Sequence, residues 1–345
     1  MKTTTKNMQS GNQSTQPSYT SQLSRIGLTL TMAATFLCGF AVSSTYSIAQ
    51  AQTITGQATV GHPGWVQIPG ELIRPDCVHE IPKGATVEVA NGQITGDVTL
   101  NGALFAHYDA CTEDAVVTRP RGRNGNLAHA PGTGNGWVED SQWDLSLGKS
   151  DNIDFMGGNW TVPSYPSSYG ALIYLFNGIA PSSENWILQP VLQFGSNGIM
   201  GGNYWGIASW MVGPNGYAFY SPLEAVYPGD SILGYTEIYG TSGKTLYWEV
   251  LAQDTTSGVY SGITAHTSGL HWTWAYAGVL EAYNVTSCSQ FPSNNRAVFT
   301  NSTIAHGFPY YETISGQGWV GDIYSYGGPH CHFMVVAGSE STLDF

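Results

Sequence analysis

The stretch Asn185-Trp-Ile-Leu-Gln-Pro-Val-Leu-Gln-Phe-Gly195 carries two glutamines inside a sequence that otherwise has the composition of a buried strand. Successive side chains of a β-strand point to opposite faces. One face of this strand therefore carries, in order, Ile187, Gln189, Val191 and Gln193. Because glutamine is seldom a core residue, we expect this face to line a groove. A half-solvated antiparallel strand would show the same alternation and is the alternative.

A carboxyl stands in a second strand-like stretch, residues 275–285, with no basic residue near it in sequence. Alternation predicts that Glu281 shares its face with Ala277, Val279 and Tyr283. Apolar surroundings disfavour the charged form of a carboxyl and so raise its affinity for a proton. Such a group can act as general base toward water and then as general acid.

A glutamine complements this carboxyl, because its NH2 can donate to an oxyanion while its carbonyl oxygen holds the attacking water. Glu249, in Leu246-Tyr-Trp-Glu-Val-Leu251, is the alternative carboxyl. We interpret it as an outward-facing strand position.

Short β-rich runs recur about every ten residues from Trp137 onward, separated by Gly, Pro, Asn and Ser. The pattern predicts an all-β fold, an antiparallel two-sheet β-sandwich of the concanavalin A-like jelly-roll type. The expected strands cover residues 171–176, 186–194, 204–212, 231–239, 245–252, 271–285 and 333–336.

Three segments are expected along the chain. Residues 1–51 combine basic residues, an apolar run and small residues before Gln52, which is typical of a secretory signal peptide. Residues 52–133 form a small β-rich unit, with the hairpin signal Asn91-Gly92, and end in a linker rich in Gly, Asn, Pro and Ala. Residues 134–345 form the sandwich domain.

The charge balance of the secreted part is strongly acidic. The leader contributes three basic residues and no acid, which leaves 8 Lys and Arg against 24 Asp and Glu. This balance argues against nucleic acid or anionic membrane partners. Four cysteines remain after the leader, an even number that predicts two disulfides, and proximity in sequence favours Cys77 with Cys111 and Cys288 with Cys331.

Several hydrolase signatures are absent from the sequence. It has no Gly-x-Ser-x-Gly elbow, no His-Glu-x-x-His helix, no Asp-Thr-Gly or Asp-Ser-Gly loop, and no Glu-x-Asp-x-Glu strand. His330-Cys331-His332 does not suit a metal ion, because neighbours in a strand point apart and Cys331 is expected in a disulfide. We therefore expect no metal and no cofactor.

The stretches around the two catalytic candidates resemble the eqolisins, the secreted glutamic peptidases. Val191-Leu-Gln-Phe-Gly195 is similar to the family's Ile-Leu-Gln-Thr-Gly strand, and Gly278-Val-Leu-Glu-Ala-Tyr283 to its Ile-Ile-Glu-Asp-Phe strand. Pro228-Gly-Asp-Ser-Ile232 and Trp160-Thr-Val-Pro163 resemble further family segments. The resemblance implies that Gln193 and Glu281 are the catalytic pair, and it covers roughly residues 155–290.

The sequence departs from the family where the groove is expected. Phe176 replaces an active-site tryptophan, Trp210-Met-Val-Gly213 lacks a glutamate, and Ala282 replaces the acid after the catalytic glutamate. Gln189 ends a similar Ile-Leu-Gln triplet, so the register can shift by four residues. The chain thus resembles a divergent member, near bacterial or neprosin-like branches, with residues 52–133 as its prosegment.

These observations predict a secreted, acid-active, monomeric endopeptidase that acts on polypeptides, with a groove lined by Phe176, Trp205, Trp210 and Tyr283. The alternative is a carbohydrate-binding sandwich in which exposed aromatics stack on sugars. Trp205, Trp210 and Tyr217 are the candidates for that stacking. A third alternative is a secreted structural protein in which the Gln and the Glu are inert.

Overall fold

The computed structural model describes residues 62–109, 111, 116–118, 134–145, 152–183, 186–213, 217–315, 318–324 and 328–345. The expected signal peptide, residues 1–51, and residues 119–133, which include the expected linker, lie outside these residues. All described residues belong to one compact unit, Ile54–Phe345. No helix in the described ranges has the length and apolar character needed to cross a membrane.

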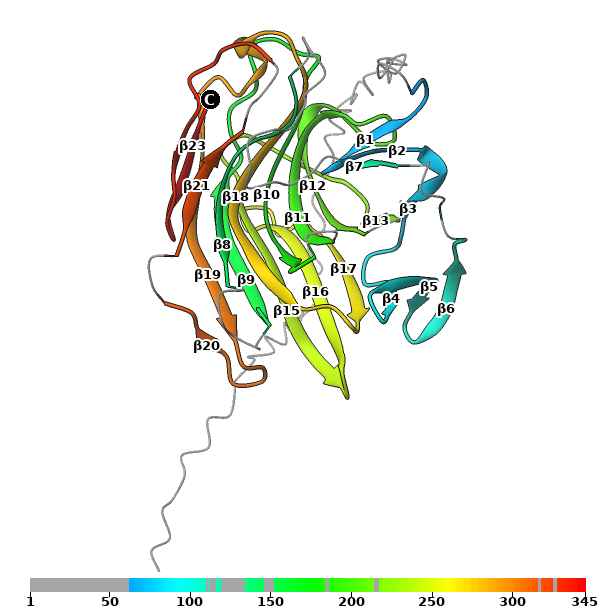
Figure 1. The fold of residues 1–345 in the computed structure, drawn as a ribbon. Coiled ribbons are helices and arrows are strands. Elements are labelled where there is room, and N and C mark those ends of the chain that lie inside the picture. The colour runs from blue at the N-terminus through cyan, green and yellow to red at the C-terminus, as the bar shows by residue number, and fades with distance from the viewer. Residues whose placement is uncertain are drawn as a thin grey trace, which may run out of the picture. The chain divides into compact units, whose positions relative to one another are not determined.

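The described strands form three sheets (Figure 1). The nine-stranded sheet has the order β21 (Val320–Ile323), β8 (Gly134–Asp144), β18 (Trp272–Val285), β10 (Leu172–Pro181), β11 (Ile187–Ser196), β12 (Gly201–Val212), β13 (Ala218–Tyr220) and β3 (Val78–Glu80), and β14 (Glu224–Val226) also pairs with β12. The eleven-stranded sheet has the order β22 (Met334–Val336), β23 (Ser341–Asp344), β19 (Arg296–His306), β9 (Phe155–Thr161), β15 (Ser231–Ser242), β16 (Thr245–Asp254), β17 (Tyr260–Thr267), β4 (Thr86–Ala90), β5 (Gln93–Leu100) and β6 (Ala103–His107), and β20 (Glu312–Thr313) pairs with β19. The small sheet has the order β1 (Val66–Ile68), β2 (Glu71–Ile73) and β7 (Val116–Thr118), and two 3-10 helices cover Pro75–Cys77 and Cys288–Gln290.

The two large sheets pack face to face and enclose an apolar core. Leu188 and Leu192 of β11 point into it, and from the other sheet come Trp160, Trp248 and Val250, all buried. Alternation places these β11 residues on the face opposite the glutamines, as period two requires. The predicted all-β sandwich is confirmed, and each predicted run falls on a strand.

Two local predictions are also confirmed. Asn91 and Gly92 both have positive φ, 53° and 73°, and join β4 to β5 as a two-residue hairpin. Cys77 is bonded to Cys111, and Cys288 to Cys331.

Residues 62–118, called here the N-terminal segment, extend both large sheets at one edge. Strand β3 pairs in parallel with β13, and β4 pairs in parallel with β17. Figure 1 draws these strands in blue and cyan beside the sandwich. The segment therefore contacts both layers of the sandwich.

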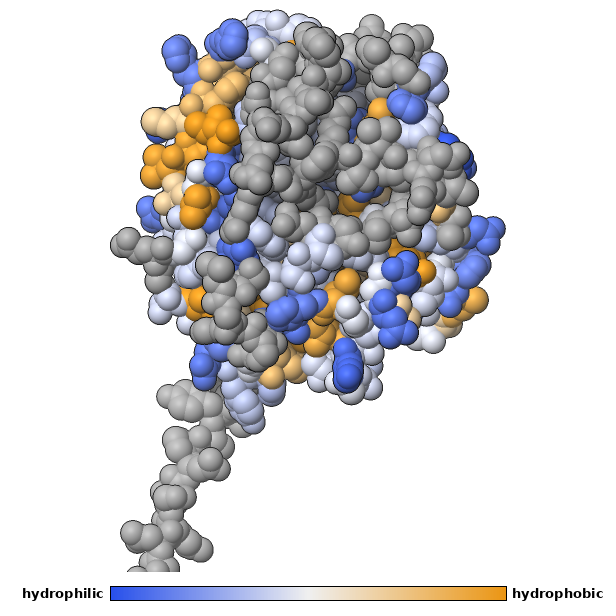
Figure 2. Space-filling model, in the orientation of Figure 1, coloured by the Kyte–Doolittle hydropathy of each residue, from blue (hydrophilic) through white to orange (hydrophobic). Residues whose placement is uncertain are grey.

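Several exposed apolar side chains lie on edge strands of the two large sheets. Figure 2 shows orange surface on the side where β21 and β23 lie in Figure 1. Edge strands β21 and β22 expose four large apolar side chains, Val320, Ile323, Met334 and Val336.

Candidate active site

Gln193 and Glu281 lie abreast on one face of the nine-stranded sheet, with Tyr174 between them. Tyr174 of β10 is directly opposite Gln193 of β11 on one side and Glu281 of β18 on the other. Two strand spacings separate the Cα atoms of Gln193 and Glu281 by about 10 Å. All three side chains are at most 1% exposed. Strand pairing thus brings together a carboxyl, a phenol and an amide from distant parts of the sequence.

The amide nitrogen of Gln193 is held by backbone carbonyls. Its Nε2 donates to the carbonyl oxygens of Gly195, at 2.9 Å, and Met200, at 3.3 Å. A Cβ atom on Gly201 would stand 2.3 Å from this nitrogen, and Gly201 has a φ of +86°, so glycine makes room for the amide. Within the described residues, Oε1 of Gln193 has no hydrogen-bond partner.

Glu281 receives two hydrogen bonds at Oε1. The backbone N–H of Gly70 donates to this oxygen at 2.7 Å, and the hydroxyl of Tyr283 donates to it as well. Tyr283 lies two residues along β18 and therefore on the same face. The predicted proximity of Tyr283 to the carboxyl is present in the structure.

A hairpin of the N-terminal segment covers this row of side chains. Strands β1 and β2 are joined at Pro69-Gly70, and Gly70 has the positive φ, +86°, that a Pro-Gly turn uses. The hydroxyl of Tyr174 donates to the backbone oxygen of Gln67 at 2.8 Å. One short hairpin thus presents a peptide carbonyl to Tyr174 and a peptide N–H to Glu281.

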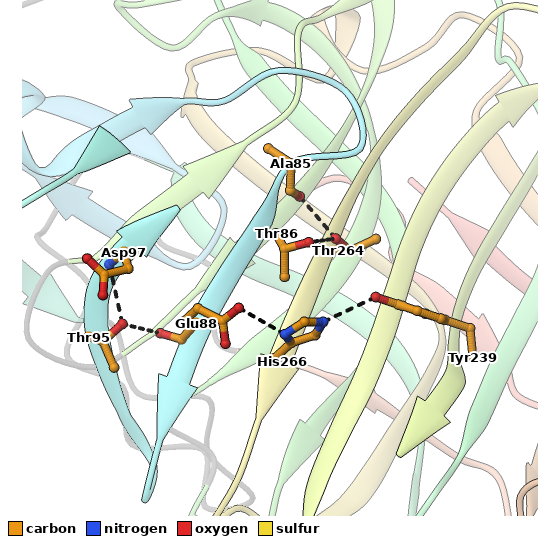
Figure 3. A network of polar contacts seen from close by, with 8 residues as sticks. All are labelled: Ala85, Thr86, Glu88, Thr95, Asp97, Tyr239, Thr264 and His266. Carbon is orange, nitrogen blue, oxygen red and sulfur yellow. Dashed lines mark hydrogen bonds and ion pairs between the residues drawn. The ribbon is translucent and has the colours of Figure 1, made fainter. Parts of the chain in front are cut away.

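Polar contacts join strand β4 of the N-terminal segment to strand β17 within the eleven-stranded sheet (Figure 3). Nδ1 of His266 contacts Oε1 of Glu88 at 2.9 Å, and its Nε2 contacts the hydroxyl of Tyr239 at 3.3 Å. The hydroxyls of Thr86 and Thr264 are 2.6 Å apart. An ion pair, Lys83 with Glu224 at 2.6 Å, also joins the segment to the sandwich. Charged groups therefore contribute to the attachment.

Gln189 lies on the same face as Gln193 but in a different environment. It is opposite Trp210, and a Cβ atom on Gly178 would stand 3.2 Å from the Cβ of Gln189. Neither amide atom of Gln189 has a hydrogen-bond partner among the described residues, although the side chain is 1% exposed. No carboxyl is opposite Gln189 on either neighbouring strand.

The other predicted site residues divide between the two faces of the sheet. Phe176 and Trp210 belong to the cluster on the face of Gln193. Trp205 packs with Phe194 in the core between the sheets, so it does not line that face. Glu249 is half-buried on the eleven-stranded sheet, where the hydroxyl of Tyr235 donates to it at 2.8 Å.

Two expectations require correction. The side chains of Trp205, Trp210 and Tyr217 are buried, at 0%, 0% and 5% exposure, because the second sheet and the N-terminal segment cover them. The prediction that they are exposed and available to stack on sugars is therefore wrong. Ala277 lies in the core between the sheets, since the strand pairing of β18 has a bulge between Tyr276 and Gly278 that changes the alternation.

Sequence reasoning missed Tyr174 and Trp137. Trp137 of β8 is opposite Glu281 and makes an edge contact with Phe176, with ring centroids 5.8 Å apart. A tryptophan thus lies beside the carboxyl, on the strand that neighbours β18 on the side away from Tyr174. No local signal identifies either residue, because each acquires its role through strand pairing.

No family model and no curated protein matches the sequence. The chain is similar to the crystal structure of scytalido-glutamic peptidase with a transition state analog inhibitor, at 15% identity and a TM-score of 0.42, over 62% of this chain and 99% of that one. The chain is also similar to SCP-B, a member of the eqolisin family of peptidases in a complex with a tripeptide, at 14% identity and a TM-score of 0.41, with the same coverage of both chains. A third similar structure is the CBM2 module of an evolved Dit protein of Lactobacillus casei BL23 phage J-1. Its sequence identity is 11% and its TM-score is 0.25, over 64% of this chain and 94% of that one. With TM-scores below 0.5, these likenesses by themselves assign neither a family nor an activity to the chain.

Proposed function

We propose that this protein is a secreted, acid-active endopeptidase of the glutamic type, with Glu281 and Gln193 as its catalytic pair. One observation carries the proposal: the two side chains lie abreast on one buried face, and the chain's own peptide N–H is held at 2.7 Å against the Glu281 carboxyl. A site that holds peptide groups in this way suits a peptide substrate.

The chemical roles follow from what each side chain can donate or accept. The Glu281 carboxylate takes a proton from water, whose oxygen attacks the scissile carbonyl, and later gives the proton to the leaving amine. The Oε1 atom of Gln193 is an acceptor that can orient this water. The expected donation from Gln193 to the oxyanion requires its amide to exchange the two carbonyls that now hold it.

Residues 52–133 act, in this proposal, as a prosegment that covers the site. The β1–β2 hairpin occupies the contacts of Tyr174 and Glu281. Neither disulfide joins residues 62–118 to residues 134–345, so after cleavage in the linker only non-covalent contacts would hold the segment. The contact of Glu88 with His266 and the ion pair of Lys83 with Glu224 hold the segment to the sandwich.

The function is tested by incubating the purified full chain with a denatured protein at about pH 4 and following the fragments by mass spectrometry. Hydrolysis that disappears in Glu281→Gln supports the proposal. Binding of the same sample to a glycan array without any hydrolysis would instead favour a carbohydrate-binding sandwich.

The prosegment role has its own test. Samples of the full chain are held at about pH 7 and about pH 4, and chain length and activity are measured together over time. We expect cleavage between residues 119 and 133 to accompany the appearance of activity in acid. A chain that stays intact and is fully active at about pH 4 would exclude the prosegment role.

A further inference from the structure

Tyr174 occupies the middle of the row that contains the proposed catalytic pair. It is directly opposite both Gln193 and Glu281, and it is fully buried. Any group that reaches both Gln193 and Glu281 must therefore pass the Tyr174 side chain. The position makes this phenol a neighbour of the reacting atoms.

The row needs a hydrogen-bond donor for the oxyanion of a tetrahedral intermediate. A carboxamide nitrogen carries two hydrogens, and the two hydrogens of Gln193 already serve Gly195 and Met200. The remaining polar atom of the Gln193 side chain is Oε1, which can only accept a hydrogen bond. A carboxylate at Glu281 also accepts only. Within the row, the hydroxyl of Tyr174 is the side-chain donor directed at a peptide group.

The structure shows that this hydroxyl binds a peptide carbonyl. It donates to the backbone oxygen of Gln67 at 2.8 Å, while the N–H of Gly70 in the same hairpin donates to Glu281 at 2.7 Å. The hairpin therefore places C=O and N–H groups where a bound peptide would offer its own. Burial raises the pKa of Tyr174 well above its usual range, so the phenol keeps its proton; the Asn197 side chain opposes this shift and the negative charge of Glu281 adds to it.

We propose that the hydroxyl of Tyr174 is a catalytic hydrogen-bond donor to the scissile carbonyl oxygen, while Gln193 acts as the acceptor that orients the water. This inference rests on the proposed peptidase function and adds a third residue to its machinery. The role belongs to this chain's own arrangement, in which Gln193 is committed to backbone carbonyls.

The reaction balances without a further reactant. A water proton moves to Glu281 as the water oxygen bonds to the carbonyl carbon, and the C=O electron pair moves to the oxygen that Tyr174 holds. The C=O bond then re-forms, the C–N bond breaks, and the nitrogen takes the electron pair and the proton from Glu281. The products are a carboxylic acid and an amine, and Tyr174 keeps its proton throughout.

The test is Tyr174→Phe in the full chain, assayed at about pH 4 with a fluorogenic peptide after acid incubation. Removing one oxyanion donor typically lowers kcat by about 10²- to 10³-fold. We expect that loss with KM changed by less than about threefold, since the donor acts mainly in the transition state. Tyr276→Phe, which removes a hydroxyl from another buried tyrosine of the same cluster, is the matched control and should keep its kcat.

The outcomes separate this inference from the function on which it rests. Wild-type hydrolysis with an unchanged kcat in Tyr174→Phe overturns the role of Tyr174 and leaves the peptidase function standing. A wild type that cleaves no peptide refutes the function itself. If Tyr174→Phe fails to fold, 3-fluorotyrosine at position 174 keeps the ring and strengthens the donor. A change in kcat at constant KM then supports the role, and an unchanged kcat overturns it.

Discussion

Gln193 and Gln189 lie four residues apart on the same face of β11, end similar triplets, and are equally buried, yet their surroundings differ. Gln193 has two backbone acceptors for its amide nitrogen and lies in a row with Tyr174 and Glu281. Gln189 lies between Gly178 and Trp210, and no described residue bonds to its amide. A buried amide is therefore not by itself evidence of catalysis; its neighbours on the adjoining strands decide what it can do.

The largest effect is expected for Glu281, because this carboxyl lies in the row of Gln193 and no carboxyl is opposite Gln189. Glu281→Gln should lower kcat by about 10²- to 10⁴-fold, because a carboxamide cannot transfer the proton. Hydrolysis of a denatured protein at about pH 4 measures it, with circular dichroism to check the fold. Glu249→Gln on the other sheet is the control. If the Glu281→Gln variant hydrolysed the substrate and the Glu249→Gln variant did not, the assignment of the site would be refuted.

The two glutamines can be compared directly by truncation. Gln193→Ala removes the acceptor that orients the water and should lower kcat by about 10²-fold or more. Gln189→Ala should change kcat by less than about threefold, because its amide faces no carboxyl. The same peptide assay serves both variants. The reverse result would move the catalytic glutamine by four residues.

Stability should respond in the opposite sense at the two positions. A buried polar group without a partner costs about 1 to 3 kcal/mol, so Gln189→Met should raise the free energy of unfolding by an amount of that order. Gln193→Met breaks two hydrogen bonds to backbone carbonyls, so it should lower that free energy. Urea unfolding at neutral pH measures both. A stabilising Gln193→Met would show that its bonds contribute nothing.

The N-terminal segment offers the smallest and most gradual effect, through the pH dependence of its attachment. His79 of the N-terminal segment stacks on Tyr108, with ring centroids 3.9 Å apart, and is near Phe219 of β13. Burial lowers the pKa of His79 from 6.5 to about 4, although the nearby charge of Asp76 opposes the shift. The neutral His79 ring therefore contributes fully to the stability of the attached N-terminal segment above about pH 6.5, and this contribution is lost as the pH falls through about 4.

His79→Phe keeps an aromatic ring at this position and cannot be protonated. We expect the pH at which the segment detaches, followed by limited proteolysis, to move downward by a fraction of a unit. His107→Gln, on the exposed strand β6, is the control and should leave that pH unchanged. Detachment at the wild-type pH in His79→Phe would exclude a contribution from this histidine.

The local sequence determined the strands, the hairpin at Asn91-Gly92 and the common face of Gln189 and Gln193. These features depend on neighbours a few residues apart, since period-two alternation and the positive φ of a tight turn are properties of short stretches of backbone. The same reasoning failed at Ala277, because a bulge interrupts the alternation without a sequence signal of its own.

Only the tertiary structure decided which residues meet. Strand order sets Tyr174 between the glutamine and the glutamate, and it turns Trp205 toward the second sheet. The sequence predicted residues 52–133 as a prosegment. Its contacts with Tyr174 and Glu281, however, are made by a hairpin that lies more than a hundred residues away from them in the chain. Pairing between distant strands is selected by burial and hydrogen bonding over the whole fold, which no local pattern encodes.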